Sequence, residues 1–291
     1  MQILFWLIEG GDNMHEHVSQ SIRARSLPYG IREFYFPNQE TWAYITSEAR
    51  TAFGSTAHFA KTALRRGREI IEQLRVDPYG QQSIDPQKDN PRLKHDRTVI
   101  SVTVESHNHQ LIPVAIKGPG MLLQPDSTYT PVSFDSSEGM RREPLVLQMM
   151  HMQALRTAFK EVLNEDQRAI VDILPVYGAC SMQEPENNIF DALLMQAIPH
   201  AQLASEHEIG PNRFGSKYGF LKSEHPRLLD AFPELQQVPE DIIPWGNLME
   251  IINARLTPYG LTLTTANFSG RSLLIDENGK YWLFDLRSDS T

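Results

Sequence analysis

Apolar residues recur every three or four positions in two long segments of the chain, which is the spacing of one buried helix face. The segment 56–74 carries lysines and arginines between its apolar positions, and the segment 144–163 begins with a proline that suits a first helical turn. We therefore expect both segments to be helices. Shorter stretches with the same spacing predict five more helices, at 39–53, 165–174, 188–198, 226–235 and 245–256.

Alternating apolar and polar positions predict β-strands. Residues 98–104 alternate in this way, and residues 111–116 follow a polar His-Asn-His turn, so we expect a hairpin. Three more strands are expected near the end of the chain, at 261–266, 272–275 and 281–286. The dipeptide Asn278-Gly279 favours a tight turn between the last two. Because strands and helices occupy separate blocks, the sequence predicts an α+β fold.

Two irregular stretches divide these elements. The stretch 77–96 holds three prolines and almost no apolar residues, which predicts an exposed linker or long loop. The stretch 118–143 contains further prolines and a polar run, and is also expected to be irregular. We therefore predict an N-terminal module of helices and a β-hairpin over 1–140, and a C-terminal module of helices with an antiparallel sheet over 141–291.

Charge and composition narrow the classes of function. The chain has 291 residues, of which 41% are hydrophobic, as in globular proteins. It has 27 lysines and arginines against 36 aspartates and glutamates, and its formal net charge is -9. Sequence-independent nucleic-acid binding needs concentrated positive charge, so no nucleic-acid partner is expected.

The single cysteine and the first residues bear on localisation. One cysteine, Cys180, can form neither an internal disulfide nor a cysteine-rich zinc site, which fits a reducing compartment. The apolar run 1–8 has no basic residues before it and is too short for a signal peptide or a membrane span. We therefore expect a protein of the cytoplasm or of a host cytosol, without membrane contact.

Common cofactor and metal motifs are absent from the sequence. It has no phosphate-binding glycine loop, no dinucleotide-binding glycine motif and no serine nucleophile elbow. The pairs His15/His17 and His107/His109 have a spacing that metal sites use, but the first lies in a polar loop and the second at the expected hairpin turn. The sequence therefore predicts no cofactor and no metal.

Two short motifs in the last third of the chain carry a family resemblance. Residues 185–193, Pro-Glu-Asn-Asn-Ile-Phe-Asp-Ala-Leu, resemble the nucleophile segment Asp-Gly-Asn-Cys-Leu-Phe-x-Ala-Leu of ovarian-tumour (OTU) type deubiquitinases. Residues 270–275 and 280–288 look like the closing hairpin of papain-like deubiquitinases, in which Gly-His begins one strand and an Asp ends the next. The resemblance implies a papain-like C-terminal part, with the nucleophile at the start of a helix and the base on a later strand.

Carried over position by position, the resemblance implies a catalytically degenerate domain, a pseudoenzyme. The nucleophile position falls on Asn188 and the base position on Gly270 or Arg271, and none of these residues can perform that chemistry. Asp285 is retained as the orienting acid. Such a scaffold acts by binding a protein, and a ubiquitin-like partner is the expected kind. The binding residues that it implies are Gln183, an oxyanion donor in the family, together with Asn187, Asn188 and Arg271.

Two other functions stay open. In the first, Cys180 is the nucleophile of an active cysteine hydrolase in a different register, and otherwise it is a buried small apolar residue. Its base would be one of three histidines, His200, His207 or His225. In the second, the protein is a structural or assembly component, such as a virion or secretion-system protein, which fits the lack of an intact catalytic motif. The sequence does not predict the oligomeric state.

Overall fold

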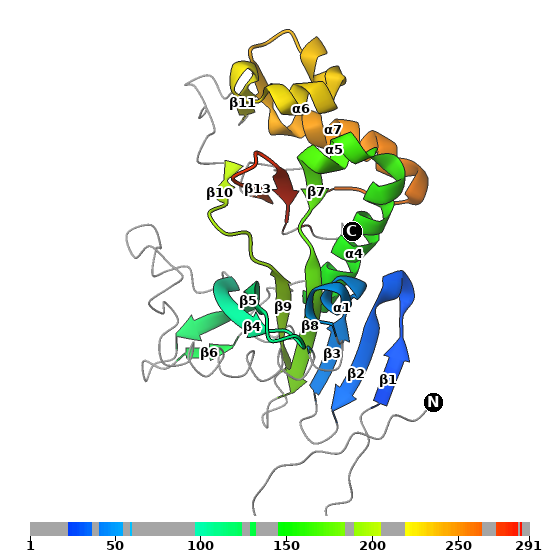
Figure 1. Ribbon diagram of the computed structural model, residues 1–291, viewed down its shortest axis with the longest axis vertical. Helices are drawn as coiled ribbons and strands as arrows, with labels where there is room; N and C mark the ends of the chain where they lie inside the picture. The colour runs from blue at the N-terminus through cyan, green and yellow to red at the C-terminus, as the bar shows by residue number, and fades with distance from the viewer. Residues whose placement is uncertain are drawn as a thin grey trace, which may run out of the picture.

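Helices and strands are both present in the computed structural model of the chain (Figure 1). The structure describes residues 23–36, 41–54, 59, 97–123, 129–131, 145–183, 189–204, 219–263, 272–284 and 286. Mainly antiparallel sheets pack against helices that do not alternate regularly with the strands. The predicted α+β class is therefore confirmed.

An eight-stranded antiparallel sheet is the largest element of the fold. Its strand order is β1-β2-β3-β8-β9-β5-β4, and β6 pairs with β5. The strands are β1 Arg23–Ser26, β2 Arg32–Phe36, β3 Thr41–Ile45, β4 Arg97–Glu105, β5 Leu111–Leu123, β6 Tyr129–Pro131, β8 Val176–Gln183 and β9 Ile189–Gln196. Because β8 pairs with β3 and β9 pairs with β5, strands from both sides of residue 140 meet in this one sheet.

The centre of the large sheet is buried on both faces. On β9, Leu194 belongs to one hydrophobic cluster and its neighbour Leu193 to another, since successive side chains point to opposite faces. The first cluster includes residues of helix α1 (Ser47–Phe53), and the second includes residues of helix α4 (Leu145–Val162). The sheet is therefore a middle layer, and we name its two faces the α1 face and the α4 face.

A smaller sheet and three helices complete the described fold, above the large sheet in Figure 1. The order of the smaller sheet is β10-β13-β14-β7, in which β7 and β14 are parallel. Its strands are β7 Val171–Ile173, β10 Gln202–Leu203, β13 Leu273–Ile275 and β14 Tyr281–Leu283. The remaining elements are α5 Glu165–Ile170, α6 Pro226–Ala231, α7 Trp245–Leu256, the pair β11 Gly219–Leu221 and β12 Ile242–Pro244, and 3₁₀ turns at Pro28–Gly30, Lys222–Glu224, Pro233–Gln237 and Thr257–Tyr259.

Several predicted elements are confirmed. Helix α4 matches the predicted segment 144–163, and α7 matches 245–256. Helix α5 begins after Asn164, whose side chain accepts a hydrogen bond from the backbone N–H of Gln167 at 2.9 Å and so caps the helix. The end predicted for it, at 174, is wrong, because residues 171–173 form strand β7, and the helix predicted at 226–235 is regular only to Ala231. Strands β4 and β5 form the expected hairpin, and Gly279 with φ of 73° lies in the turn before β14.

The helix predicted at 188–198 is wrong, because residues 189–196 form strand β9. Both faces of β9 are buried, so its side chains form an almost continuous apolar run instead of an alternating one. An apolar run of this kind does not distinguish a buried strand from a buried helix. The helix that the papain-like resemblance implies after Asn188 is therefore replaced by a strand.

The single helix predicted at 39–53 is also wrong, because strand β3 precedes helix α1 in this segment. Thr46 ends the strand and caps the helix, since its hydroxyl accepts a hydrogen bond from the backbone N–H of Ala49. Gly178 of β8 lies opposite Ile45. A Cβ atom at Gly178 would lie only 2.5 Å from the carbonyl oxygen of Tyr44, so glycine permits this close pairing.

Other expectations are changed in extent or lie outside the described residues. Strand β5 continues to Leu123, so the start of the stretch 118–143 is regular, and residues 261–263 are not a strand. Of the predicted helix 56–74 only Phe59 is described, and it is helical and buried. No helix in the described part of the chain is long and apolar enough to cross a membrane. The segments 1–8, 77–96 and 264–266 lie outside the described residues.

The core position Leu155 gives a direct test of the layered packing. Leu155 on α4 is completely buried against the α4 face, whereas Leu147 on the same helix is 50% exposed. We expect Leu155→Ala to lower the free energy of unfolding by about 2–5 kcal/mol, because it leaves a cavity. The control Leu147→Ala should change it by less than about 0.5 kcal/mol. Urea unfolding measures both, and equal effects of the two variants would contradict this packing.

Candidate functional site

Cys180 lies in the interior of the large sheet. It is 1% exposed and pairs with Ala43 on β3 and with Ala192 on β9. Its side chain belongs to the cluster on the α1 face. In this position Cys180 fills a small apolar space between two strands, which is the alternative that the sequence left open for it.

Of the three candidate base histidines, the two that the structure describes, His200 and His225, lie apart from the cluster that contains Cys180. His225 packs against Phe220 and Trp245, which belong to the cluster that includes α4, and its Nδ1 makes a hydrogen bond with the hydroxyl group of Tyr281. Cys180 belongs to the other cluster. His200 is exposed in a turn with φ of 55°. The third candidate, His207, lies outside the described residues.

Most of the binding residues implied by the resemblance lie outside the described part of the chain. Gln183 is the last residue of β8, and its backbone pairs with Ile189. The other implied residues, Asn187, Asn188, Arg271 and Asp285, lie outside the described residues. Their roles therefore stay predictions.

In the histidine pair at the first hairpin, His109 contacts a nearby carboxylate. His109 in the turn between β4 and β5 is highly exposed, and its Nδ1 lies 2.5 Å from Oε1 of Glu105. Within the described residues, no group of three or more histidine, cysteine, aspartate or glutamate side chains is placed to hold a metal ion. The pair His15/His17 lies outside these residues.

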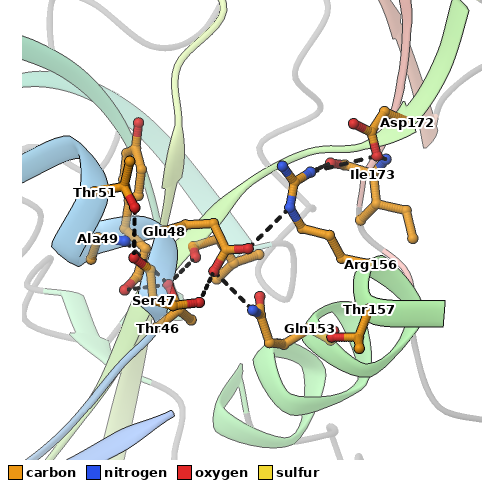
Figure 2. Close-up of polar contacts among 12 residues, drawn as sticks. Thr46, Ser47, Glu48, Ala49, Thr51, Gln153, Arg156, Thr157, Asp172 and Ile173 are labelled. Carbon is orange, nitrogen blue, oxygen red and sulfur yellow. Dashed lines mark hydrogen bonds and ion pairs between the residues drawn. The ribbon is translucent and has the colours of Figure 1, made fainter. Parts of the chain in front are cut away.

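The structure contains a half-buried series of charges that the sequence analysis did not predict (Figure 2). Arg156 on α4 lies between two carboxylates: its Nε is 3.2 Å from Oε1 of Glu48, and its Nη1 is 3.6 Å from Oδ1 of Asp172. Asp172 on β7 then lies 3.4 Å from Nζ of Lys280, just before β14. We call Glu48, Arg156, Asp172 and Lys280 the ion-pair chain.

Local structure positions each charge of the ion-pair chain. The Thr46 cap starts α1 and places Glu48 in its first turn, where a negative charge is favoured. The hydroxyl of Thr46 also donates a hydrogen bond to the carbonyl of Val176 at 2.6 Å, which ties this helix start to β8. Arg156 additionally donates a hydrogen bond to the carbonyl of Ile173. The chain of charges therefore joins α1, α4 and the smaller sheet.

Glu48 remains ionised within this environment. Burial alone raises the pKa of its carboxyl group, but hydrogen bonds from Gln153, from its own backbone N–H and from Ser47, together with the charge of Arg156, outweigh this effect. The pKa of Glu48 is therefore lowered from its ordinary value. Because hydrogen bonds and charge partners already occupy the carboxylate, the arrangement suits stabilisation of the fold better than proton transfer.

A different group of side chains lies on the α4 face, on the strands at the edge of the sheet. Tyr35 on β2 and Trp42 on β3 are cross-strand neighbours whose rings lie 4.9 Å apart. On β1, Arg23 is directly opposite Tyr35, and both Arg23 and Arg25 are exposed. We call Arg23, Arg25, Tyr35 and Trp42 the Arg–aromatic surface.

The Arg–aromatic surface is partly solvated. Within the described residues, neither Tyr35 nor Trp42 belongs to a hydrophobic cluster or packs against one. Arg25 is paired with Glu33 at 2.9 Å, whereas Arg23 has no ion-pair partner in the described part of the chain. Next to them, burial and the charge of Glu33 raise the pKa of Tyr44, so its hydroxyl keeps its proton.

The two features differ in what they can do chemically. The charges of the ion-pair chain are paired with one another, whereas the Arg–aromatic surface has two exposed arginines beside two partly exposed rings. Sequence reasoning missed both, for different reasons. Glu48 and Arg156 are 108 positions apart and meet only through the packing of α1 and α4, and only the strand register aligns Arg23 with Tyr35 and Trp42. In comparisons with known proteins, no family model matches the chain and no curated protein matches it in sequence.

The lowered pKa of Glu48 predicts a contribution to acid stability. A carboxyl group whose pKa is lower in the folded than in the unfolded state stabilises the fold above the ordinary value of 4.5, and this stabilisation is lost as the pH falls through the lower, folded-state pKa. We expect Glu48→Gln to reduce the loss of stability below pH 4.5, measured by urea unfolding at several pH values. The control Glu161→Gln, at an exposed position of α4, should keep the wild-type pH profile. Superimposable profiles of all three proteins would contradict the prediction.

Proposed function

We propose that this protein acts by binding another protein, without thiol-based hydrolysis. The observation that carries the proposal is the position of Cys180, which is 1% exposed between two paired strands. A nucleophilic thiol must reach its substrate and have a base beside it. Access to Cys180 would require the sheet to separate from the α1 layer.

The proposed partner is a protein because the accessible chemistry of the described residues suits one. The Arg–aromatic surface combines arginine, tyrosine and tryptophan, the side chains that are enriched at the energetic centres of protein interfaces. A ubiquitin-like partner is the kind that the OTU resemblance implies, through Gln183, Asn187, Asn188 and Arg271. The proposal of protein binding does not depend on the papain-like helix, whose place β9 takes.

An assembly component is the second candidate function. The observation that favours it is the edge of the large sheet, where β1 ends the strand order and all four of its residues are exposed. Exposed edge strands can pair with a second chain. Copies of this protein could thus associate through β1.

The rate at which a thiol reagent labels Cys180 tests the proposal that the protein does not use this thiol for hydrolysis. Since Cys180 is the single cysteine of the chain, each modified thiol reports on it alone. We expect iodoacetamide to label the native protein at least about 100-fold more slowly than the urea-unfolded protein, which corresponds to an opening free energy of about 2.7 kcal/mol. A ubiquitin probe carrying a thiol-reactive group should form no adduct. Fast labelling, or an adduct that Cys180→Ser abolishes, would refute the proposal.

The oligomeric state separates the two candidate functions. If the protein acts as a binding module, sedimentation velocity at micromolar concentration should show a monomer. A large assembly of defined size would instead support the structural function, since a structural component has to associate with copies of itself. Arg25→Glu, on β1, provides the matched variant, because a change in assembly on this substitution would locate the contact at the sheet edge.

A further inference from the structure

We propose that the Arg–aromatic surface is a docking site for an extended, acidic, proline-containing segment of a protein partner. The inference rests on the proposed function, because it names the kind of partner that the binding protein takes. The four residues lie on one face of the three antiparallel strands β1, β2 and β3. Register aligns Arg23, Tyr35 and Trp42 in a single row across these strands.

The ring pair accounts for the proline part of the segment. Tyr35 and Trp42 lie side by side, with 4.9 Å between ring centroids and 33° between their planes, and both are partly exposed. Their side chains carry a phenol hydroxyl and an indole N–H, which can donate hydrogen bonds. Extended proline-rich segments dock on aromatic residues in this way, because their rings are apolar and their carbonyls are unpaired acceptors. The rings and the donors thus match both features of such a chain.

The arginines account for the acidic part. Arg23 has no ion-pair partner within the described residues, and Arg25 is only partly neutralised by Glu33. A row over three strands spans about 10 Å, since neighbouring strands lie about 4.8 Å apart. A polyproline helix rises about 3.1 Å per residue, so about three residues cover the row. A proline on the ring pair therefore places a carboxylate two or three residues away next to Arg23.

The same residues disfavour a nucleic acid as occupant. Glu33 lies in the neighbouring row, opposite Arg25 and beside Tyr44, so a continuous phosphate backbone would meet a carboxylate on this face. The net charge of the chain, -9, adds a general repulsion of polyanions. A short peptide can instead place its few negative charges on the arginines and its rings on Tyr35 and Trp42.

Fluorescence anisotropy with labelled peptides tests the proposal. We expect the full chain to bind a peptide with a central run of prolines flanked by glutamates. It should bind more weakly when lysines replace the glutamates or glycines replace the prolines. Single-stranded RNA serves as the competing probe. Failure of the proline–glutamate peptide to bind, or tighter binding of the RNA, would overturn the inference.

Variants locate the site. We expect Trp42→Ala to weaken peptide binding by at least about 10-fold, because aromatic residues at interface centres carry large shares of the binding energy. Arg23→Glu should weaken it by about 3- to 10-fold at low salt and less at high salt. The control Arg50→Glu changes the charge equally, at an exposed position of α1, which packs on the other face of the sheet. Because Arg23 is exposed, Arg23→Glu keeps the test valid if Trp42→Ala misfolds. Equal binding by Arg23→Glu and Arg50→Glu would place the site elsewhere.

The result of the peptide-binding experiment is independent of the result of the thiol-labelling experiment on Cys180. An inert thiol together with no peptide binding would overturn the docking site and leave the absence of hydrolysis intact. A reactive, adduct-forming Cys180 would overturn the proposed function whatever the peptide does. Peptide binding that depends on Trp42 and Arg23, with an inert thiol, is the result that supports both.

Discussion

The burial of strands β8 and β9 on both faces is the constraint on which the rest of the fold depends. Where their side chains are described, Val176, Ala179, Leu193 and Met195 pack toward α4, and Tyr177, Cys180, Ala192 and Leu194 pack toward α1, so this part of the strand pair is buried on both faces. The small buried side chains of Ala179, Cys180 and Ala192 allow the layers to pack closely. The same packing keeps the thiol of Cys180 away from solvent, and a reactive thiol needs access to its substrate.

Burial alone does not fix how the layers are oriented, and the ion-pair chain supplies that information. Glu48, Arg156, Asp172 and Lys280 alternate in sign and come from α1, α4, β7 and the approach to β14. A half-buried charge is tolerated only with its partner, so each of these elements fits one arrangement of the others. Hydrophobic contacts hold the layers together. The ion pairs make the observed relative orientation of the layers more stable than slightly shifted orientations.

The sequence predicts those elements that have a clear apolar periodicity or lie next to a characteristic turn dipeptide. Helix α4 has one apolar face and is predicted closely, and Asn278-Gly279 marks the last hairpin. Strand β9 is missed because two buried faces remove its alternation, and the same apolar run carries much of the resemblance to the OTU nucleophile segment. The ion-pair chain and the Arg–aromatic surface could not be predicted, since Arg156 and Glu48 are 108 positions apart and only register aligns Arg23 with Trp42.

In the docking site that we propose, the edge of the large sheet suits a partner segment lying across the strands better than it suits a second copy of this chain. Helix α4 covers the central strands, and β1 to β3 leave a tyrosine, a tryptophan and two arginines on the same face. Arginines on an edge strand discourage pairing with an identical edge, because like charges would meet. They attract a segment of opposite charge, which can lie across the strands on the ring pair without adding to the sheet. In this proposal, the same side chains thus disfavour self-pairing at β1 and favour an acidic partner.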